Sequence, residues 1–253
     1  MTVQYCSDLH LEFSQNKKFI SKYPLVPKGD ILLLAGDIIP FAIMDEQKDF
    51  FNFIADNFEQ TYWIPGNHEY YGSDIATKSG QIHEAIRSNV FLVNNLVITS
   101  NKVRLIASTL WSHIPEESYI PIQYRMSDFS AIRNDGKPFT PARYNELHQQ
   151  CKTFITEALS QSADLPTMVV THHIPTFLNY PAKYKRDVLN VAFATEMYNL
   201  IEQTNIDYWL YGHHHVNTPS FTIGKTQLIT NQLGYIQYKE NAGFKKDAVI
   251  EFL

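Results

Sequence analysis

The sequence has few cysteines and no long apolar run. It contains 253 residues and two cysteines, Cys6 and Cys151, which are too few for a disulfide framework. A chain of this length can bury a sizeable core and does not need such a framework. No stretch approaches the roughly 18 consecutive apolar residues of a membrane-spanning helix, so we expect no membrane contact. No basic segment followed by an apolar run lies near Met1, so we expect no signal peptide and a cytoplasmic location.

Positive charge is also scarce. The 21 Lys and Arg residues are outnumbered by 26 Asp and Glu residues, and the formal net charge is -5. Non-specific nucleic-acid binding usually accompanies a basic balance, so this composition counts against nucleic acid as a partner. The apolar share of 44% and the charged share of 19% are ordinary for a globular protein. We therefore expect one domain over residues 1–253, while the oligomeric state stays open.

Five short apolar runs each end in a cluster of polar residues. Each run is rich in Val, Ile, Leu, Tyr or Trp, which is typical of a strand buried on both faces. The runs with their clusters are VQYCSDLH (3–10), ILLLAGD (31–37), YWIPGNHE (62–69), MVVTHH (168–173) and YWLYGHHH (208–215). Strands that alternate with helical spacing indicate an α/β fold. The predicted helices cover residues 44–59, 74–88, 140–160 and 192–204.

The rest of the chain predicts more strands and one long insertion. Three further segments are expected to form strands: the pair 96–100 and 103–109, the hairpin 221–230, and a final strand at 246–253. Residues 111–139 show no clear period. A connection of that length inside a compact domain is usually functional, so we expect this segment to form a cap over the site.

Seven residues in the polar clusters are of types that bind metal ions. They offer carboxylate, imidazole and amide groups but no thiolate, a set that suits Mn, Fe or Zn. In open α/β sheets, ligands bind beyond the carboxyl ends of the strands, where all five clusters are expected. Seven groups are too many for one tetrahedral zinc, so we predict two divalent metal ions that share a bridging carboxylate. The candidate ligands are Asp8, His10, Asp37, Asn67, His172, His213 and His215.

The charge of such a site favours phosphate. Two divalent cations carry more positive charge than Asp8 and Asp37 return, and a bridging hydroxide still leaves the site positive. Two-metal sites are typical of phosphatases and nucleases. We predict that a metal-bound hydroxide attacks phosphorus and that His68, next to Asn67, assists the leaving group as a general acid. His68 and Asp37 are therefore the expected catalytic residues.

Other residues of the clusters and the cap are less specific. His173 could contact the substrate, lie behind the ligands, belong to the surface or bind a metal ion itself. His113 could reach the substrate from the cap or be a solvated loop residue. Arg125 could bind phosphate oxygens bidentately or be an exposed surface residue. Asn67 is expected to contact the substrate as well as a metal ion.

The three consecutive histidines at 213–215 raise a question of direction. In extended backbone, alternate side chains point the same way. We therefore expect His213 and His215 to converge on the metal ions and His214 to point elsewhere.

The order DxH, GD, GNHE, THH and GHxH resembles the calcineurin-like metallophosphoesterase superfamily. The motifs span residues 8–215. The resemblance implies two stacked, mixed β-sheets flanked by helices in a four-layer sandwich, with a dinuclear metal centre at one edge. It implies that Asp37 bridges the two ions and that His68 is the catalytic histidine. The implied ligands are Asp8, His10 and His215 for the first metal, and Asn67, His172 and His213 for the second.

Departures from subfamily patterns narrow the expected activity. Protein phosphatases of this superfamily continue the second motif as GDxVDRG and place Arg before GNHE, whereas this chain has GDIIPF and IPGNHE. The chain more closely resembles compact bacterial-type phosphoesterases. We therefore expect hydrolysis of a small phosphomonoester or phosphodiester. Two alternatives stay open: a DNA or RNA nuclease of the same superfamily, and a binding scaffold that has kept the fold without catalysis.

Overall fold

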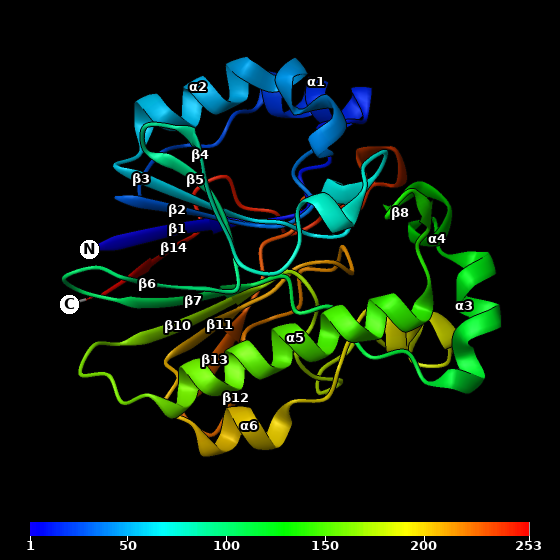
Figure 1. The fold of residues 1–253 in the computed structure, drawn as a ribbon. Helices are drawn as coiled ribbons and strands as arrows, with labels where there is room; N and C mark the ends of the chain where they lie inside the picture. Colours follow the sequence, from blue (N-terminus) through cyan, green and yellow to red (C-terminus); the bar gives the residue numbers. More distant parts are fainter. Residues whose placement is uncertain (253) are drawn as a thin grey trace.

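The computed structural model describes residues 1–252 and consists of four layers. Two six-stranded sheets pack face to face, and helices cover the outer face of each sheet (Figure 1). Three clusters of buried apolar side chains fill the spaces between the layers. The predicted α/β sandwich of two mixed sheets flanked by helices is therefore confirmed.

The first sheet has parallel strands at its centre that end at the same edge. Cys6 pairs with Leu34, and Ala35 pairs with Ile64. All five residues of the run ILLLA are buried, because helices cover one face of this strand and the second sheet covers the other. The order is β14-β1-β2-β3-β5-β4, formed by β1 (Thr2–Cys6), β2 (Ile31–Ala35), β3 (Gln60–Ile64), β4 (Ile82–Arg87), β5 (Val90–Asn94) and β14 (Val249–Glu251).

The second sheet follows the same plan. Four strands run parallel at its centre, and antiparallel strands form both edges. Its order is β12-β13-β11-β10-β7-β6, formed by β6 (Leu96–Thr99), β7 (Arg104–Ser108), β10 (Thr167–Thr171), β11 (Tyr208–Leu210), β12 (Phe221–Ile223) and β13 (Thr226–Ile229). The predicted strand pair and hairpin are confirmed. The final strand expected at 246–253 is β14, although residue 253 lies outside the described residues.

The helix predicted at 140–160 is confirmed as α5 (Pro141–Ser160). The hydroxyl of Thr140 accepts a hydrogen bond of 3.2 Å from the backbone N–H of Arg143, which satisfies one free donor of the first turn. The other helices differ in length from the prediction. Residues 44–59 form part of a 3-10 helix (Phe41–Gln47) and α2 (Lys48–Asn57), and only Tyr198–Gln203 of 192–204 forms α6. Helix α1 (Ser14–Lys22) was not predicted.

The prediction of a helix at 74–88 is wrong. This segment forms a 3-10 helix (Ile75–Thr77) and then the edge strand β4. Gly80 lies between them with φ of 74°, a left-handed conformation that cannot continue a right-handed helix. Strand β4 obtains its hydrogen bonds by antiparallel pairing with β5. A local apolar pattern does not reveal such pairing, because β-structure depends on its neighbours.

The segment 111–139 projects beyond the carboxyl edge of the sheets, as expected of a cap (Figure 1, right). It contains a 3-10 helix (Glu116–Ser118), α3 (Tyr119–Arg125), α4 (Asp128–Ala131) and a short hairpin of β8 (Arg133–Asn134) and β9 (Lys137–Pro138). Its side chains Ile122, Phe129 and Phe139 are buried in the same apolar cluster as Tyr144 of α5. The cap is thus packed onto the body of the protein.

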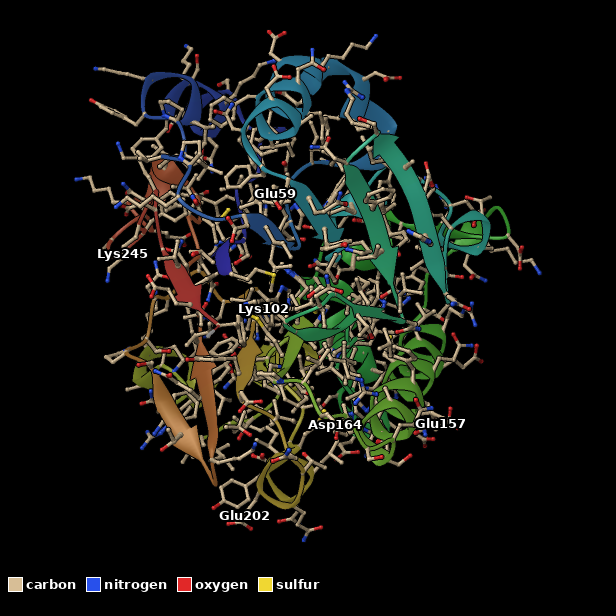
Figure 2. All side chains as sticks on the ribbon, turned by 90° about the vertical axis from the view of Figure 1, so that its left-hand side faces the viewer. Glu59, Lys102, Glu157, Asp164, Glu202 and Lys245 are labelled. Carbon is tan, nitrogen blue, oxygen red and sulfur yellow. The ribbon has the colours of Figure 1, made fainter. Side chains whose placement is uncertain are left out.

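The face opposite the cap carries charges of both signs. Figure 2 shows this face, and its labelled side chains are exposed: Glu59, Lys102, Glu157, Asp164, Glu202 and Lys245. Within residues 1–252, every helix is too short or too polar to cross a membrane.

Candidate metal centre

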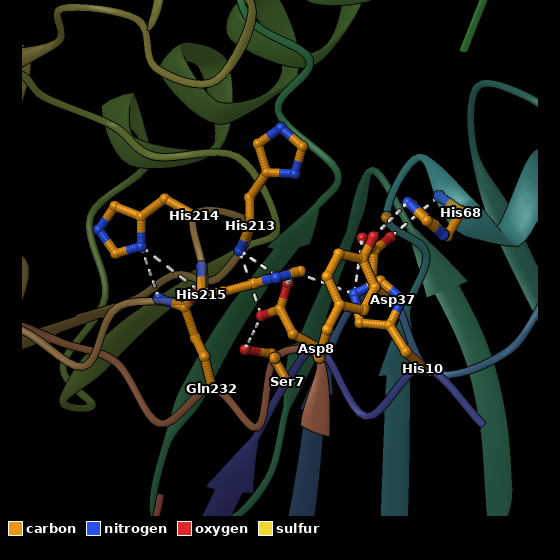
Figure 3. A network of polar contacts seen from close by, with 12 residues as sticks. Ser7, Asp8, His10, Asp37, His68, His213, His214, His215 and Gln232 are labelled. Atoms are coloured by element: carbon orange, nitrogen blue, oxygen red, sulfur yellow. Dashed lines mark hydrogen bonds and ion pairs between the residues drawn. The ribbon is translucent and has the colours of Figure 1, made fainter. Parts of the chain in front are cut away.

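The polar clusters meet where the carboxyl ends of the two sheets face each other (Figure 3). Parallel strands end at one edge of a sheet, so clusters far apart in the sequence become neighbours. The structure brings all seven expected ligands together there. They come from the ends of β1 (Asp8, His10), β2 (Asp37), β3 (Asn67), β10 (His172) and β11 (His213, His215).

Four side chains form a first group that could hold a metal ion. They are Asp8, His10, Asp37 and His215, with ligand atoms within 4.8 Å of one another. Nε2 of His10 lies 2.9 Å from Nε2 of His215 and 3.7 Å from Oδ2 of Asp37. Nε2 of His215 lies 3.4 Å from Oδ1 of Asp8. Two ring nitrogens and two carboxylates therefore point at one place.

A second group shares Asp37 with the first. It contains Asp37, His172 and His213, and Nε2 of His172 lies 3.0 Å from Nδ1 of His213. Nε2 of His172 also lies 3.4 Å from Oδ1 of Asp37 and 3.2 Å from the amide oxygen of Asn67. Asp37 thus faces the first group with Oδ2 and the second group with Oδ1. This is the arrangement that a bridging carboxylate requires.

Strained backbone turns most of these side chains inward. Asp8, His10, Asp37, His213 and His215 all have positive φ, between 47° and 82°. Residues other than glycine adopt this left-handed region at a cost, and such residues cluster at functional sites. The prediction of extended backbone at 213–215 is therefore wrong. His213 and His215 converge because both lie in the left-handed region.

His214 points away from the two groups, as expected, but it is not free. Its ring is 4% exposed, and Nδ1 lies 3.0 Å from Nε2 of Gln232 (Figure 3). Gln232 also accepts a hydrogen bond of 2.6 Å from the backbone N–H of His215. His214 therefore packs against the loop that positions His215.

Two glycines make room for the second group. A Cβ on Gly66 would lie 2.3 Å from Oδ1 of Asp37 and 2.7 Å from Nε2 of His172. A Cβ on Gly36 would lie 2.3 Å from Nδ1 of His172. Asp37 and His172 are buried and held by the backbone on either side. Neither side chain can therefore move away from an added methyl group. The glycines of GD and GNHE are therefore required by close approach of these side chains.

Hydrogen bonds from the far side of each ring aim three of the histidines. Nδ1 of His10 faces Oε1 of Glu12 at 3.1 Å, and Nδ1 of His215 faces Oε2 of Glu240 at 2.7 Å. Nδ1 of His172 faces the carbonyl oxygen of Ala35 at 2.9 Å. Such partners fix the tautomer of a metal-binding histidine and leave Nε2 free for the ion.

The electrostatics of the two groups favour positive charge. Burial alone would lower the pKa of His172 and His215. Asp37 nevertheless raises the pKa of His172 to about 9, and Asp8 with Glu240 raises that of His215 to about 10. Burial also opposes charge on Asp37, but the facing His172 and His68 hold its pKa well below the usual value. Buried carboxylates that stay ionised are suited to bind cations.

One buried atom adds to this picture. Nε2 of His213 is buried and has no hydrogen-bond partner in the part of the chain that the structure describes. Nδ1 of the same ring faces the second group. There it lies 3.0 Å from Nε2 of His172, and two ring nitrogens that face each other can share a proton or, with both lone pairs, a metal ion. The donor types, their convergence and the glycine-lined space fit a pair of divalent ions.

The comparison with known families agrees with this geometry. Residues 1–217 match the model of a family described as calcineurin-like phosphoesterase. The chain belongs to the calcineurin-like phosphoesterase family. Its activity is therefore that of a phosphoester hydrolase.

Relatives of this phosphoesterase extend over nearly its whole length. An uncharacterised protein of Acanthamoeba polyphaga mimivirus is 31% identical over 265 residues, which cover 94% of this chain and 93% of the relative. The crystal structure of a phosphopantetheinyl hydrolase from Mycobacterium tuberculosis has a TM-score of 0.70 at 17% identity, with 98% of this chain and 95% of that chain covered. A dimetal phosphatase from Danio rerio has a TM-score of 0.45 at 13% identity, with 92% and 87% covered.

His68 of the phosphoesterase lies beside both groups. Its backbone N–H donates to Oδ1 of Asp37 at 2.9 Å, and its Nδ1 lies 3.0 Å from Oε1 of Glu12. Its Nε2 lies 3.3 Å from the hydroxyl of Tyr235, and its ring stacks on Tyr71 with centroids 4.1 Å apart. Burial alone would lower the pKa of His68, but the carboxylates of Asp37 and Glu12 outweigh it and raise that pKa.

Glu69 ties together the loops that carry Asp37 and Asn67. Its carboxylate is fully buried and accepts four N–H groups. The donors are the backbone of Asp37 (2.9 Å), Ile38 (2.7 Å) and Gly66 (2.7 Å), and the indole of Trp63 (3.0 Å). Burial, together with the charge on Asp37, raises the pKa of Glu69 to about 7. The last residue of GNHE is therefore a structural clamp.

A cavity of about 320 Å³ opens onto the two groups from the side of the cap. Asp37, Asn67 and His68 form part of its wall. The cap contributes Arg125, Met126, Ser127 and Asp128, and the segment after β10 contributes Tyr180, Tyr184, Asp187 and Phe193. The expectation that 111–139 covers the site agrees with this lining.

Arg125 reaches the cavity wall but is already paired. Its guanidinium forms two contacts of 2.9 Å with the carboxylate of Asp187, which joins the cap to the opposite wall. The other two residues considered for substrate contact lie elsewhere. His173 is fully buried, with Nε2 3.0 Å from the hydroxyl of Tyr144, and His113 is exposed beside His148. Neither is among the residues that line this cavity.

Sequence reasoning missed four acidic residues around the site: Glu12, Glu69, Asp128 and Glu240. Glu69 lies within the polar cluster after β3, and Glu12 lies two residues beyond His10, so their nearness in sequence to candidate ligands was a usable signal. Asp128 and Glu240 lie in segments without a motif. Only the fold brings them to the candidate metal centre.

Proposed function

We propose that this phosphoesterase hydrolyses a small phosphomonoester or phosphodiester with two divalent metal ions. The observation that carries the proposal is the position of Asp37. Its two oxygens face two separate groups of side chains, with Nε2 of His10 on one side and Nε2 of His172 on the other. Asp8, His10, Asp37 and His215 would hold the first ion, and Asp37, Asn67, His172 and His213 the second. Mn, Fe and Zn all suit this donor set.

Metal ions bound here would lower the pKa of a water molecule and offset the charge of phosphoryl oxygens. The rest of the chemistry falls to the protein. Asp37 and Asp8 supply the negative charge that retains the ions, and Glu12 and Glu240 aim the rings of His10 and His215. The cap and the wall opposite line the space in which the reacting group would lie.

His68 is proposed to protonate the leaving-group oxygen. Glu12 accepts a hydrogen bond from the Nδ1–H group of His68, so the ring is oriented with Nε2 toward Tyr235 and the cavity. The carboxylates around the ring raise its pKa, which favours the protonated form that a general acid needs. Stacking on Tyr71 keeps the ring in this orientation.

The cavity supports a small substrate. A volume of about 320 Å³ is at the lower end of the range for small-molecule sites. The cationic wall residue Arg125 is engaged by Asp187, so the metal ions would be the main attraction for the phosphate. Because one structural neighbour is named as a phosphopantetheinyl hydrolase, a phosphopantetheinyl ester belongs in a substrate panel beside chromogenic monoesters and diesters.

The test compares wild type with Asp37→Asn and His68→Ala on that panel, with Mn, Fe or Zn added. We expect a loss of about 10²–10⁴-fold in kcat for His68→Ala. Asp37→Asn should lose bound metal as well as activity. The exposed His83 on β4 offers a control, because His83→Ala removes an imidazole that belongs neither to the two ligand groups nor to the cavity lining. Unchanged turnover in both site variants, or no metal bound by the wild type, would refute the proposal.

A further inference from the structure

Asp128 connects the cap to the metal centre. It begins helix α4, and its side chain is fully buried. Its Oδ1 accepts a hydrogen bond of 2.8 Å from the amide Nδ2 of Asn67 and one of 2.6 Å from the hydroxyl of Tyr71. Its Oδ2 is also buried, and it has no hydrogen-bond partner among residues 1–252. One carboxylate oxygen of the cap therefore accepts two hydrogen bonds from the loop that carries GNHE.

Packing alone does not explain a carboxylate in this position. A buried polar atom without a partner loses the hydrogen bonds it would make with water, and the cost is greater if the atom is charged. Leucine has the same branching, although it is larger, and would avoid that cost. A carboxylate differs from leucine because its oxygens accept hydrogen bonds and, when ionised, do not donate them. Each neighbour of Asp128 must therefore turn a donor toward it.

This requirement decides the orientation of Asn67. An asparagine amide has a donor end and an acceptor end, and it can rotate by half a turn. Because Nδ2 donates to Asp128, Oδ1 must point the other way, where it lies 3.2 Å from Nε2 of His172. Only the oxygen end of an amide is a metal ligand. Without an acceptor on the cap, the amide could present its NH₂ group to the second group of ligands.

The same oxygen holds Tyr71 in place. The hydroxyl of Tyr71 donates to Asp128, and its ring stacks on His68 at an interplanar angle of 26°. The rings of Tyr71 and His68 therefore share one orientation, which the hydrogen bond at the far end of Tyr71 maintains. Asp128 acts on both Asn67 and His68 without touching the space between the two groups of ligands.

We propose that Asp128 is a positioning residue by which the cap completes the metal centre. It orients the amide of Asn67 toward the second metal ion and holds Tyr71 against His68. The cap is then part of the catalytic centre as well as its cover. This inference rests on the proposed two-metal function, and its test separates the two.

The decisive variants are Asp128→Leu and Asp128→Asn. Asp128→Leu keeps the branched shape, with a larger side chain, and removes both acceptor oxygens. We expect its affinity for the second ion to fall about 10–100-fold, the range found for partners of metal ligands. Asp128→Asn keeps one acceptor oxygen for Asn67 and Tyr71, so most of the affinity should return. The measurements are metal content by elemental analysis and competition with a chromogenic chelator for Mn or Zn.

Two controls separate this effect from general loosening of the cap. Ser130→Ala changes an exposed residue of the same helix, whose hydroxyl donates a hydrogen bond of 3.0 Å to the backbone carbonyl of Ser127. Asp187→Asn weakens the ion pair that joins the cap to the opposite wall but leaves Asp128 intact. Both controls should retain two ions. Thermal unfolding of every variant with and without metal verifies that the fold is kept.

Exchanging the side chains of Asn67 and Asp128 tests the same contact even if Asp128→Leu fails to fold. Asn67→Asp alone would set two carboxylates against each other at the 2.8 Å contact, and metal affinity should fall. Adding Asp128→Asn places an amide donor opposite the new carboxylate. We expect this second change to recover at least about tenfold of the affinity that Asn67→Asp lost.

The outcomes distinguish the inference from the function on which it rests. A wild-type protein that binds no Mn or Zn contradicts the proposed function itself. Two ions bound with wild-type affinity by Asp128→Leu would overturn the role of Asp128 alone. That role would also be overturned if Asp128→Asn lost as much affinity as Asp128→Leu, or if the exchange gave no recovery.

Discussion

Oε2 of Glu69 accepts a hydrogen bond of 2.9 Å from the backbone N–H of Asp37, across 32 residues of sequence. The same oxygen accepts the N–H of Gly66 at 2.7 Å. The loop after β2 and the loop after β3 are thereby fastened to one buried carboxylate. The position of the expected bridging ligand depends on this clamp.

We predict that Glu69→Gln destabilises the fold. The new NH₂ group is a donor, and it would face buried backbone or indole N–H groups that are donors too. Those N–H groups would then be left without an acceptor. The expected loss is about 2–4 kcal/mol in the free energy of unfolding, measured by denaturant titration. Glu59→Gln makes the same chemical change at an exposed site, and it should alter stability by less than about 0.5 kcal/mol. Equal stability of the two variants would contradict the clamp.

Gly66→Ala is predicted to lose metal and activity together. The added methyl would lie 2.3 Å from Oδ1 of Asp37 and 2.7 Å from Nε2 of His172, so it must displace one of them. Gly80→Ala is the comparison, because its methyl meets nothing within 4 Å but its φ is 74°. That variant should lose about 1 kcal/mol of stability and keep its metal. Full metal content in Gly66→Ala, by elemental analysis, would show that the space is not needed.

The three histidines at 213–215 should respond unequally to alanine. His213→Ala and His215→Ala each remove a ring nitrogen that faces a ligand group, so we expect loss of bound metal and of phosphoesterase activity. His214→Ala removes a buried ring that contacts Gln232, so we expect a loss of stability of about 1–3 kcal/mol with metal retained. Metal content and thermal unfolding, measured on all three variants, check this. A loss of metal in His214→Ala at full stability would speak against the assignment.

Stability should fall in mild acid because of His148. Burial lowers the pKa of this ring to about 4, and its Nδ1 contacts the carbonyl oxygen of Trp111. In the unfolded chain the ring titrates near its usual pKa of about 6.5. Between these values the unfolded state binds more protons, so the contribution is present above about pH 6.5 and is lost as pH falls toward 4.

The expected slope from this one group is at most about 1.4 kcal/mol per pH unit. Denaturant unfolding of wild type and His148→Gln across about pH 7 to 4 measures it, because glutamine keeps a donor for Trp111 and cannot titrate. The variant should lose less stability than the wild type over that range. His83→Gln, at an exposed position on β4, should follow the wild-type curve. Parallel curves for wild type and His148→Gln would exclude this explanation.

Much of the fold could be predicted because the pattern is local. The run ILLLA at 31–35 is apolar at every position, so it can only be a strand or helix covered on both faces, and its length favours a strand. Thr140 and Pro141 mark a helix start by their own chemistry. The prediction for the segment 74–88 failed because its secondary structure depends on pairing with β5, which is a non-local interaction. Helix α1 was missed, although it packs Ile20 into a core.

The sequence by itself determined which chemical groups stand at the strand ends, because short apolar runs and the polar residues after them are neighbours in the chain. It also indicated that parallel strands would gather these groups at one edge. The tertiary structure alone decided how the groups are aimed. The left-handed backbone at His213 and His215, the clamp by Glu69 and the contact of Asp128 with Asn67 depend on segments that are distant in sequence. Their geometry follows from close packing around a shared site, and no local pattern encodes it.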